Sequence, residues 1–223
     1  MNKKLSTIFA AAVACVTFGA HAQEAKGDAK AGAGKIAMCI GCHGIPGYQA
    51  SFPEVYKVPM ISGQNAGYIA SALQAYRKGD RRHPTMRGIA DSLTDQDIAD
   101  VSAYYAGQVP QGGAPAKASR EPSAQVAQLL QKGACVSCHG ESFSKPIDPS
   151  YPKIAGQHPD YLFAALKAYK AGGGANGNAP VGRSNAIMAG IAKQFSNAEL
   201  KALAGYLGSL DGELQVVPQS RFR

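Results

Sequence analysis

One short pattern occurs twice in this chain and constrains its fold more than any other feature: Cys39-Ile40-Gly41-Cys42-His43 and Cys135-Val136-Ser137-Cys138-His139. On a helix, thiols at positions i and i+3 lie on one face, where both can bond to the two vinyl groups of one porphyrin. The His after the second Cys can then present its imidazole to the iron as the proximal ligand. The pattern C-x-x-C-H is typical of covalently attached c-type haem, so its two copies predict two haems.

Other kinds of site also use paired cysteines: structural disulfides, thioredoxin-like redox pairs and zinc sites. A redox pair does not need a His directly after it, and here that His is present twice. A zinc site built from both pairs would have to bring together motifs that begin 96 positions apart, far beyond the usual ligand spacing. Haem attachment therefore explains the two motifs best.

The N-terminal segment has the pattern of a cleavable signal peptide, which we expect to span residues 1–22. Two lysines precede an apolar run over residues 5–18 that is too short to cross a bilayer, and Ala20-His21-Ala22 fits a cleavage site. A lipoprotein signal at Cys15 is the alternative, but the residues before it fit poorly. Cleavage would remove the odd cysteine and leave none for a disulfide. We expect a periplasmic protein, since c-type haem is attached there, with no transmembrane segment.

The net charge is +8, or +6 once the two N-terminal lysines are removed, and it is uneven. Residues 23–112 carry nine basic and eight acidic side chains, whereas residues 113–223 carry twelve and seven. A basic docking face for an acidic redox partner and an ordinary solvated surface explain this equally well. Nucleic-acid binding is not expected, because no dense basic run with interleaved aromatic residues is present.

The chain also repeats itself after each motif. Pro59-Met60-Ile61-Ser62-Gly63-Gln64 matches Pro152-Lys153-Ile154-Ala155-Gly156-Gln157 at an offset of 93, and Met86-Arg87-Gly88-Ile89-Ala90 matches Met188-Ala189-Gly190-Ile191-Ala192 at an offset of 102. The sequence thus predicts a duplicated domain, with long loops between helices and no convincing strand. We expect domains over 23–110 and 121–210, a Gly-, Pro- and Ala-rich linker over 111–120, and a tail over 211–223 that either packs on the domains or is disordered.

Each half is expected to contain three helices. The first would run over about 28–39 and 123–135 into the haem motif, and the second would begin after Gln64 and after His158. The third has a capping-box pattern, Thr94 with Asp97 and Ser196 with Glu199. Each half would bury little side-chain core on its own, and a porphyrin would supply much of the apolar interior.

Met86 and Met188 occupy matched positions, each expected in a loop before the last helix. A lone Met is usually core filler. Two at equivalent places after two haem motifs are better explained as thioether ligands, which favour ferrous iron and raise the reduction potential. Met60 is a weaker candidate, because its counterpart is Lys153. His83 and His158 are expected to be surface or capping residues.

The two haem motifs, the P-x-[IL]-x-G-Q blocks and the M-x-G-I-A blocks resemble those of the cytochrome c4 family over residues 26–210. The resemblance implies an all-α fold of two tandem class I cytochrome c domains, each a few helices around a covalent haem c with His and Met axial ligands. It implies that the Pro59 and Pro152 carbonyls accept a hydrogen bond from the proximal imidazoles. It also implies that the haem propionates meet polar groups near the domain interface, with Arg77, Tyr76 and Tyr169 as candidates.

The sequence therefore predicts a non-enzymatic dihaem electron carrier between a quinol–cytochrome c reductase-type donor and a terminal oxidase or reductase. Its partners would be redox proteins, and peripheral membrane association stays open. The alternatives are the cytochrome subunit of a dehydrogenase complex, such as a flavoprotein sulfide dehydrogenase, and a dihaem peroxidase. The expected haem-binding residues are Cys39, Cys42, His43, Met86, Pro59, Cys135, Cys138, His139, Met188 and Pro152, and the iron ligands are His43, Met86, His139 and Met188.

Overall fold

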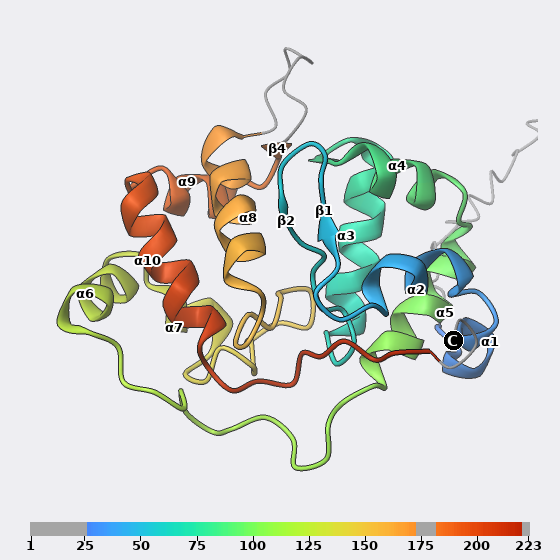
Figure 1. Cartoon of the computed structure of the whole chain (residues 1–223), viewed down its shortest axis with the longest axis horizontal. Helices are drawn as coiled ribbons and strands as arrows, with labels where there is room; N and C mark the ends of the chain where they lie inside the picture. Colours follow the sequence, from blue (N-terminus) through green and yellow to red (C-terminus); the bar gives the residue numbers. More distant parts are fainter. Residues whose placement is uncertain (1–25, 173–181, 220–223) are drawn as a thin grey trace, which may run out of the picture.

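The computed structural model describes residues 26–172 and 182–219. The expected signal peptide, residues 1–22, lies outside the described residues. Helices dominate both halves of the chain, which lie side by side in Figure 1. The first half contains α1 (Ala29–Ala33), α2 (Ala37–His43), α3 (Ala66–Lys78), α4 (Pro84–Asp91) and α5 (Asp95–Ala106). The second contains α6 (Ala124–Lys132), α7 (Cys135–His139), α8 (Pro159–Ala171), α9 (Ala186–Ala192) and α10 (Asn197–Gly208).

The helix leading into each haem motif is broken, contrary to the single helices expected over 28–39 and 123–135. Gly34 ends α1, and its N–H bonds back to Ala31 and Gly32. In the second half, Ala134 lies in the left-handed region at φ 47° just before α7. The break lets each motif form a short helix of its own, α2 and α7. Both expected capping boxes are present, at the starts of α5 and α10.

Within the described residues, four two-residue strands form two antiparallel pairs, although the sequence showed no convincing strand. These are β1 (Gln49–Ala50) with β2 (Tyr56–Lys57), and β3 (Arg81–Arg82) with β4 (Gly182–Arg183). Segments this short carry no alternating pattern, so sequence periodicity cannot reveal them. The β3–β4 pair joins the two halves, with Arg81 directly opposite Arg183.

Each half has its own buried cluster, as a duplicated domain predicts. Tyr105 and Ile98 of α5 lie in the first cluster, together with Ile36, Ile40, Ile69, Leu73, Ala90 and Val101. Phe143 and Phe195 lie in the second, together with Val126, Leu129, Leu130, Ala155, Leu162, Leu200, Leu203, Ala204, Leu207 and Leu210. Between the clusters, the hairpin of β1 and β2 reaches over to α8 (Figure 1), where the Lys57 N–H donates to Asp160 over 2.9 Å.

The C-terminal segment packs back onto the first half rather than hanging free. Residues 211–219, here called the strap, run from the end of α10 towards α1 and α5 (Figure 1). In the first half, the Ser62 carbonyl accepts from the Gln215 N–H and the Gln108 carbonyl accepts from Gln215 Nε2. Leu214 is buried, and Glu213 forms an ion pair with Lys153 of the second half. Gly63 lies beneath the strap at φ 83°, and a Cβ there would lie 2.2 Å from the Glu213 carbonyl oxygen. The strap thus ties the end of the second half to the first.

No helix in the described part of the chain is both long enough and apolar enough to span a membrane.

Candidate haem-binding sites

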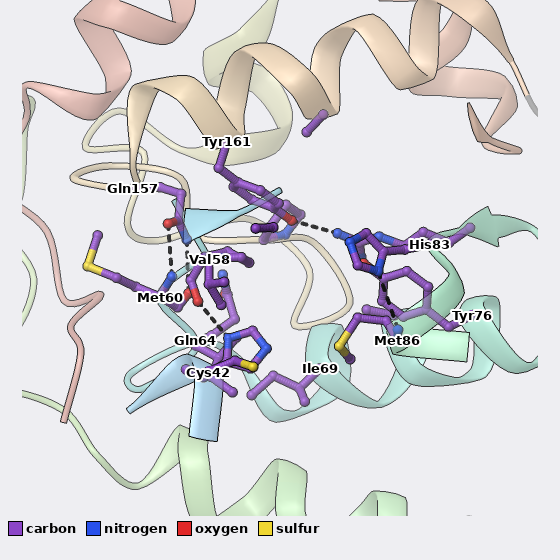
Figure 2. A pocket seen from close by; sticks show the side chains of 18 of the residues that line it. Cys42, Val58, Met60, Gln64, Ile69, Tyr76, His83, Met86, Gln157 and Tyr161 are labelled. Carbon is purple, nitrogen blue, oxygen red and sulfur yellow. Dashed lines mark hydrogen bonds between the residues drawn. The ribbon is translucent and has the colours of Figure 1, made fainter. Parts of the chain in front are cut away.

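The first haem motif opens onto a cavity of about 410 Å³. Cys39, Cys42 and His43 of α2 line it together with Pro59 and Met86, and Figure 2 shows Cys42 and Met86 on opposite sides. The His43 Nδ1 lies 2.8 Å from the Pro59 carbonyl oxygen. A carbonyl can only accept, so Nδ1 carries the proton and the lone pair stays on Nε2, the atom left free to bind a metal.

The second motif repeats this arrangement around a cavity of about 210 Å³. Cys138 and His139 of α7 line it together with Pro152 and Met188, and the His139 Nδ1 donates to the Pro152 carbonyl over 3.0 Å. Cys135 packs against the second buried cluster. All four cysteines of the described residues are free thiols, which excludes a disulfide among them.

Burial lowers the pKa of both imidazoles, and it outweighs the opposing effect of the proline carbonyls. Burial also raises the pKa of the Cys39 and Cys135 thiols. Neutral imidazoles suit metal ligation, because the unprotonated ring nitrogen keeps its lone pair. Among the described residues, no three His, Cys, Asp or Glu side chains gather as a metal site. The converged zinc site weighed against haem attachment is therefore absent from that part of the chain.

Met86 and Met188 lie in short helices, so the expectation that they sit in loops is wrong. His83 precedes α4 and its Nδ1 accepts from the Met86 N–H, while Asn185 precedes α9 and its Oδ1 accepts from the Met188 N–H. Side-chain caps of this kind stabilise helices that are too short to show a helical periodicity in the sequence. The two thioethers are thus presented from rigid, equivalent elements.

The remaining His and Met residues of the described part of the chain lie elsewhere. His83 is a capping residue, as expected. His158 stands at the start of α8 but caps it with no side-chain hydrogen bond. Met38 is exposed. The Met60 side chain extends away from Cys42 and Met86 in Figure 2, on the far side of its own backbone. Met60 therefore belongs to the loop around Pro59, which holds the His43 imidazole, and not to the opposite wall of the cavity, where Met86 lies.

Two buried arginines meet where the halves join. Arg81 and Arg183 are 7% and 9% exposed. The Arg81 guanidinium lies 4.9 Å from the Tyr76 ring centre and donates to the Tyr161 hydroxyl over 2.7 Å, while that of Arg183 lies 5.1 Å from the Tyr169 ring centre. Tyr76 and Tyr169 are therefore interfacial, as the resemblance implied. Arg77 is not, because it turns outwards to form an ion pair with Asp95.

This arginine pair carries two charges that nothing described neutralises. Within residues 26–172 and 182–219, neither guanidinium forms an ion pair with a carboxylate, and the Arg81 Nε has no hydrogen-bond partner. Burial alone would raise the pKa of Tyr161, but the two guanidiniums outweigh it and lower that pKa to about 8. Buried cations without counter-ions are costly, and both arginines line the first cavity, so the site fits an anionic group there. The two carboxylates of a haem are such a group.

The sequence does contain a pattern that indicates Arg81 and Arg183, rather than Arg77, as the interface arginines. Arg81 and Arg183 are separated by 102 positions, the same offset as Met86 and Met188. The register of the methionine blocks, extended five residues towards the N-terminus, would have identified the pair.

Comparison with known proteins agrees with the duplicated motif. The family model Cytochrome c matches residues 29–106 and again residues 123–211. The fold and sites therefore define tandem cytochrome c domains, each with a covalently attached haem c.

Similar proteins narrow this class. Cytochrome c4 of Azotobacter vinelandii is 31% identical over 228 residues, covering 94% of this chain and 100% of the relative. The thiosulfate dehydrogenase electron acceptor of Stutzerimonas stutzeri is 31% identical, covering 90% of this chain and 93% of the relative. The crystal structure of reduced recombinant cytochrome c4 from Pseudomonas stutzeri superposes with a TM-score of 0.62 at 31% identity, covering 83% of this chain and 100% of that one. The chain belongs to the cytochrome c4 family of dihaem electron-transfer proteins.

Proposed function

We propose that this chain is a periplasmic electron carrier in which His43 and Met86 bind one iron, and His139 and Met188 bind the other. The observation that carries the proposal is a donor set that occurs twice: an imidazole fixed through Nδ1 to a proline carbonyl, and a thioether on a capped helix. A permanent thioether occupies the position at which oxygen or peroxide would bind iron. Such a site suits the transfer of single electrons rather than bond-making chemistry.

Arg81 and Arg183 would complete each site by holding the carboxylates of a bound haem. They are buried cations at the domain interface, and within the described residues their guanidiniums contact tyrosines and form no ion pair with a carboxylate. Because both carboxylate pairs would converge on one arginine pair, the two haems would face one another across the interface. Electrons would then pass between the halves within a single chain.

The expected donor is a quinol–cytochrome c reductase and the expected acceptor a terminal oxidase or reductase. The signal-peptide pattern of residues 1–22 and the site of c-type haem attachment support a periplasmic location. An assay with purified partners tests this assignment: the chain should be reduced by the reductase and reoxidised by the oxidase in repeated turnovers. Reduction without reoxidation would contradict the shuttle.

Carbon monoxide binding to the fully reduced protein tests the axial ligands. If both thioethers bind iron, the visible spectrum should not change on addition of carbon monoxide, whereas Met86→Ala and Met188→Ala should each open one haem to it. Binding to the unaltered protein would identify an open iron and favour the peroxidase alternative.

A second candidate function is that of electron acceptor for a dehydrogenase. It is favoured by the thiosulfate dehydrogenase electron acceptor of Stutzerimonas stutzeri, which matches nearly the whole chain. Thiosulfate dehydrogenase and thiosulfate should then reduce the protein faster than the quinol–cytochrome c reductase does. The opposite order of rates would favour the shuttle.

A further inference from the structure

Gln64 and Gln157 occupy the same place in the two repeats, and each bonds to the opposite half. They are 3% and 4% exposed, so their carboxamides have no access to bulk water. Gln157 Oε1 accepts from the Met60 N–H over 3.0 Å, and its Nε2 donates to the Met60 carbonyl over 2.9 Å (Figure 2). Each carboxamide therefore binds the main chain of one residue through both of its polar atoms.

The exchange is reciprocal. Gln64 Oε1 accepts from the Lys153 N–H over 2.9 Å, and its Nε2 donates to the Lys153 carbonyl over 2.9 Å. Met60 and Lys153 are themselves counterparts in the repeat, but one side chain is apolar and the other cationic. Since the contacts are to the main chain, the same bond pair forms in both directions although the bound side chains differ.

The bound residue is adjacent to the carbonyl that holds the proximal imidazole. The Pro59 C=O and the Met60 N–H belong to one planar peptide group, as do those of Pro152 and Lys153. His43 donates to one end of the first group while Gln157 accepts from its other end. A peptide N–H that is hydrogen-bonded polarises its carbonyl and strengthens the bond which that carbonyl accepts. A stronger Nδ1–H bond raises the basicity of the imidazole towards iron and favours the ferric state.

We propose that Gln157 and Gln64 are positioning residues, each of which sets the proximal-ligand bond, and hence the reduction potential, of the haem in the opposite half. This inference rests on the proposed ligation by His43 and His139. It gives the interface a role beyond holding the halves together, because the proximal loop of each half is completed by a side chain of the other.

The test is to replace each glutamine and to measure both haems separately. The assay follows deuterium exchange at Nδ1–H of the iron-bound imidazoles by NMR of the oxidised protein, together with redox titration of the resolved haem methyl signals. In Gln157→Leu, exchange at His43 should accelerate and the first haem should shift towards the ferrous state by about twofold to fivefold, the equivalent of up to one neutral hydrogen bond. His139 and the second haem should not change. Gln64→Leu should give the mirror result.

Two further variants make the result decisive. Gln157→Asn keeps a carboxamide that is too short to bond both Met60 atoms, so it should give the same crossed effect, and it decides the question if the Leu variant fails to fold. Gln215→Leu is the matched control, since it also removes a bond between the halves, from Gln215 Nε2 to the Gln108 carbonyl, away from either proximal peptide. It should leave both imidazoles unchanged. The unaltered protein must first show two hyperfine-shifted imidazole signals, whose absence would count against the ligation itself. Given those signals, three results would overturn the proposal. The changes could be confined to the substituted half, they could be equal in both halves, or Gln215→Leu could produce an equal change.

Discussion

Gly63→Ala should release the strap from the first half. Gly63 has a φ of 83°, and an added Cβ would lie 2.2 Å from the Glu213 carbonyl oxygen, a backbone atom that can yield only if the strap moves. Gly79 is the matched control, because it has a φ of 82° and no heavy atom within 4 Å of its added Cβ. The two substitutions therefore share the same backbone strain, and they differ in whether the added Cβ collides with the strap.

The size of the difference follows from the contacts that would be lost. The left-handed conformation costs Ala about 1 kcal/mol at either position. Moving the strap at Gly63 also exposes Leu214, worth about 2 kcal/mol, and breaks the two Gln215 hydrogen bonds, each about 1 kcal/mol. Against this loss, the conformational entropy of three freed residues stabilises the released state by about 3 kcal/mol. The net loss of stability is about 2 kcal/mol for Gly63→Ala, against about 1 kcal/mol for Gly79→Ala.

Urea denaturation followed by haem absorption and far-UV circular dichroism measures both variants, and limited proteolysis reports the strap directly. Gly63→Ala should unfold at the lower urea concentration and lose its C-terminal segment to protease in the native state, whereas Gly79→Ala should keep it. If both variants shift equally and both protect the C-terminus, the strap is not held at Gly63 and the reasoning fails.

Three further outcomes are expected. Arg81→Gln should lower the reduction potentials by tens of millivolts, because removing a buried cation disfavours the added electron and about 1.4 kcal/mol corresponds to about 60 mV; unchanged potentials in a redox titration would contradict this. Hydrogen bonds from Lys35 lower the pKa of Asp97 and of Asp100 in the folded protein, so the two carboxylates stabilise the fold fully above about pH 4. This contribution is lost as the pH falls through the lowered pKa values. The urea midpoint should therefore fall between pH 7 and pH 2, and Lys35→Gln should flatten that fall. Phe143→Ala should destabilise the second half by about 3–5 kcal/mol in chemical denaturation, because it empties a side-chain site that is 2% exposed; a loss below about 1 kcal/mol would mean that the cluster closes around the gap.

The matched positions of the repeat were the part of the site that sequence could predict. Offsets of 93 and 102 paired the prolines and the methionines. The structure places Pro59 and Met86 at the first cavity, and it places Pro152 and Met188 at the second. Their roles as ligands stay predictions. The offsets worked because a duplicated fold keeps register within each shared block, even where loops between blocks differ in length.

Contacts between the halves could not be predicted in the same way. The G-Q blocks were recognised as a repeat, but nothing in a linear pattern shows that Gln64 bonds to the opposite copy. Arg77 and Arg81 belong to one basic stretch, and which of the two is buried depends on the pairing of β3 with β4. The helices bearing Met86 and Met188 are short and set by single capping side chains, so their sequence reads as loop.

The crossed carboxamides have a consequence for either half taken alone. A separated half would lose the partners of one glutamine and leave its own proximal loop unsupported. Each polar group that then stayed buried and unpaired would cost about 1–3 kcal/mol. Two unlinked halves would recover these bonds only by meeting in solution, so haem tuning would vary with protein concentration. The covalent connection between the halves holds them at an effective concentration on the order of millimolar. Fusion therefore makes the two potentials properties of a single molecule, independent of how much of it is present.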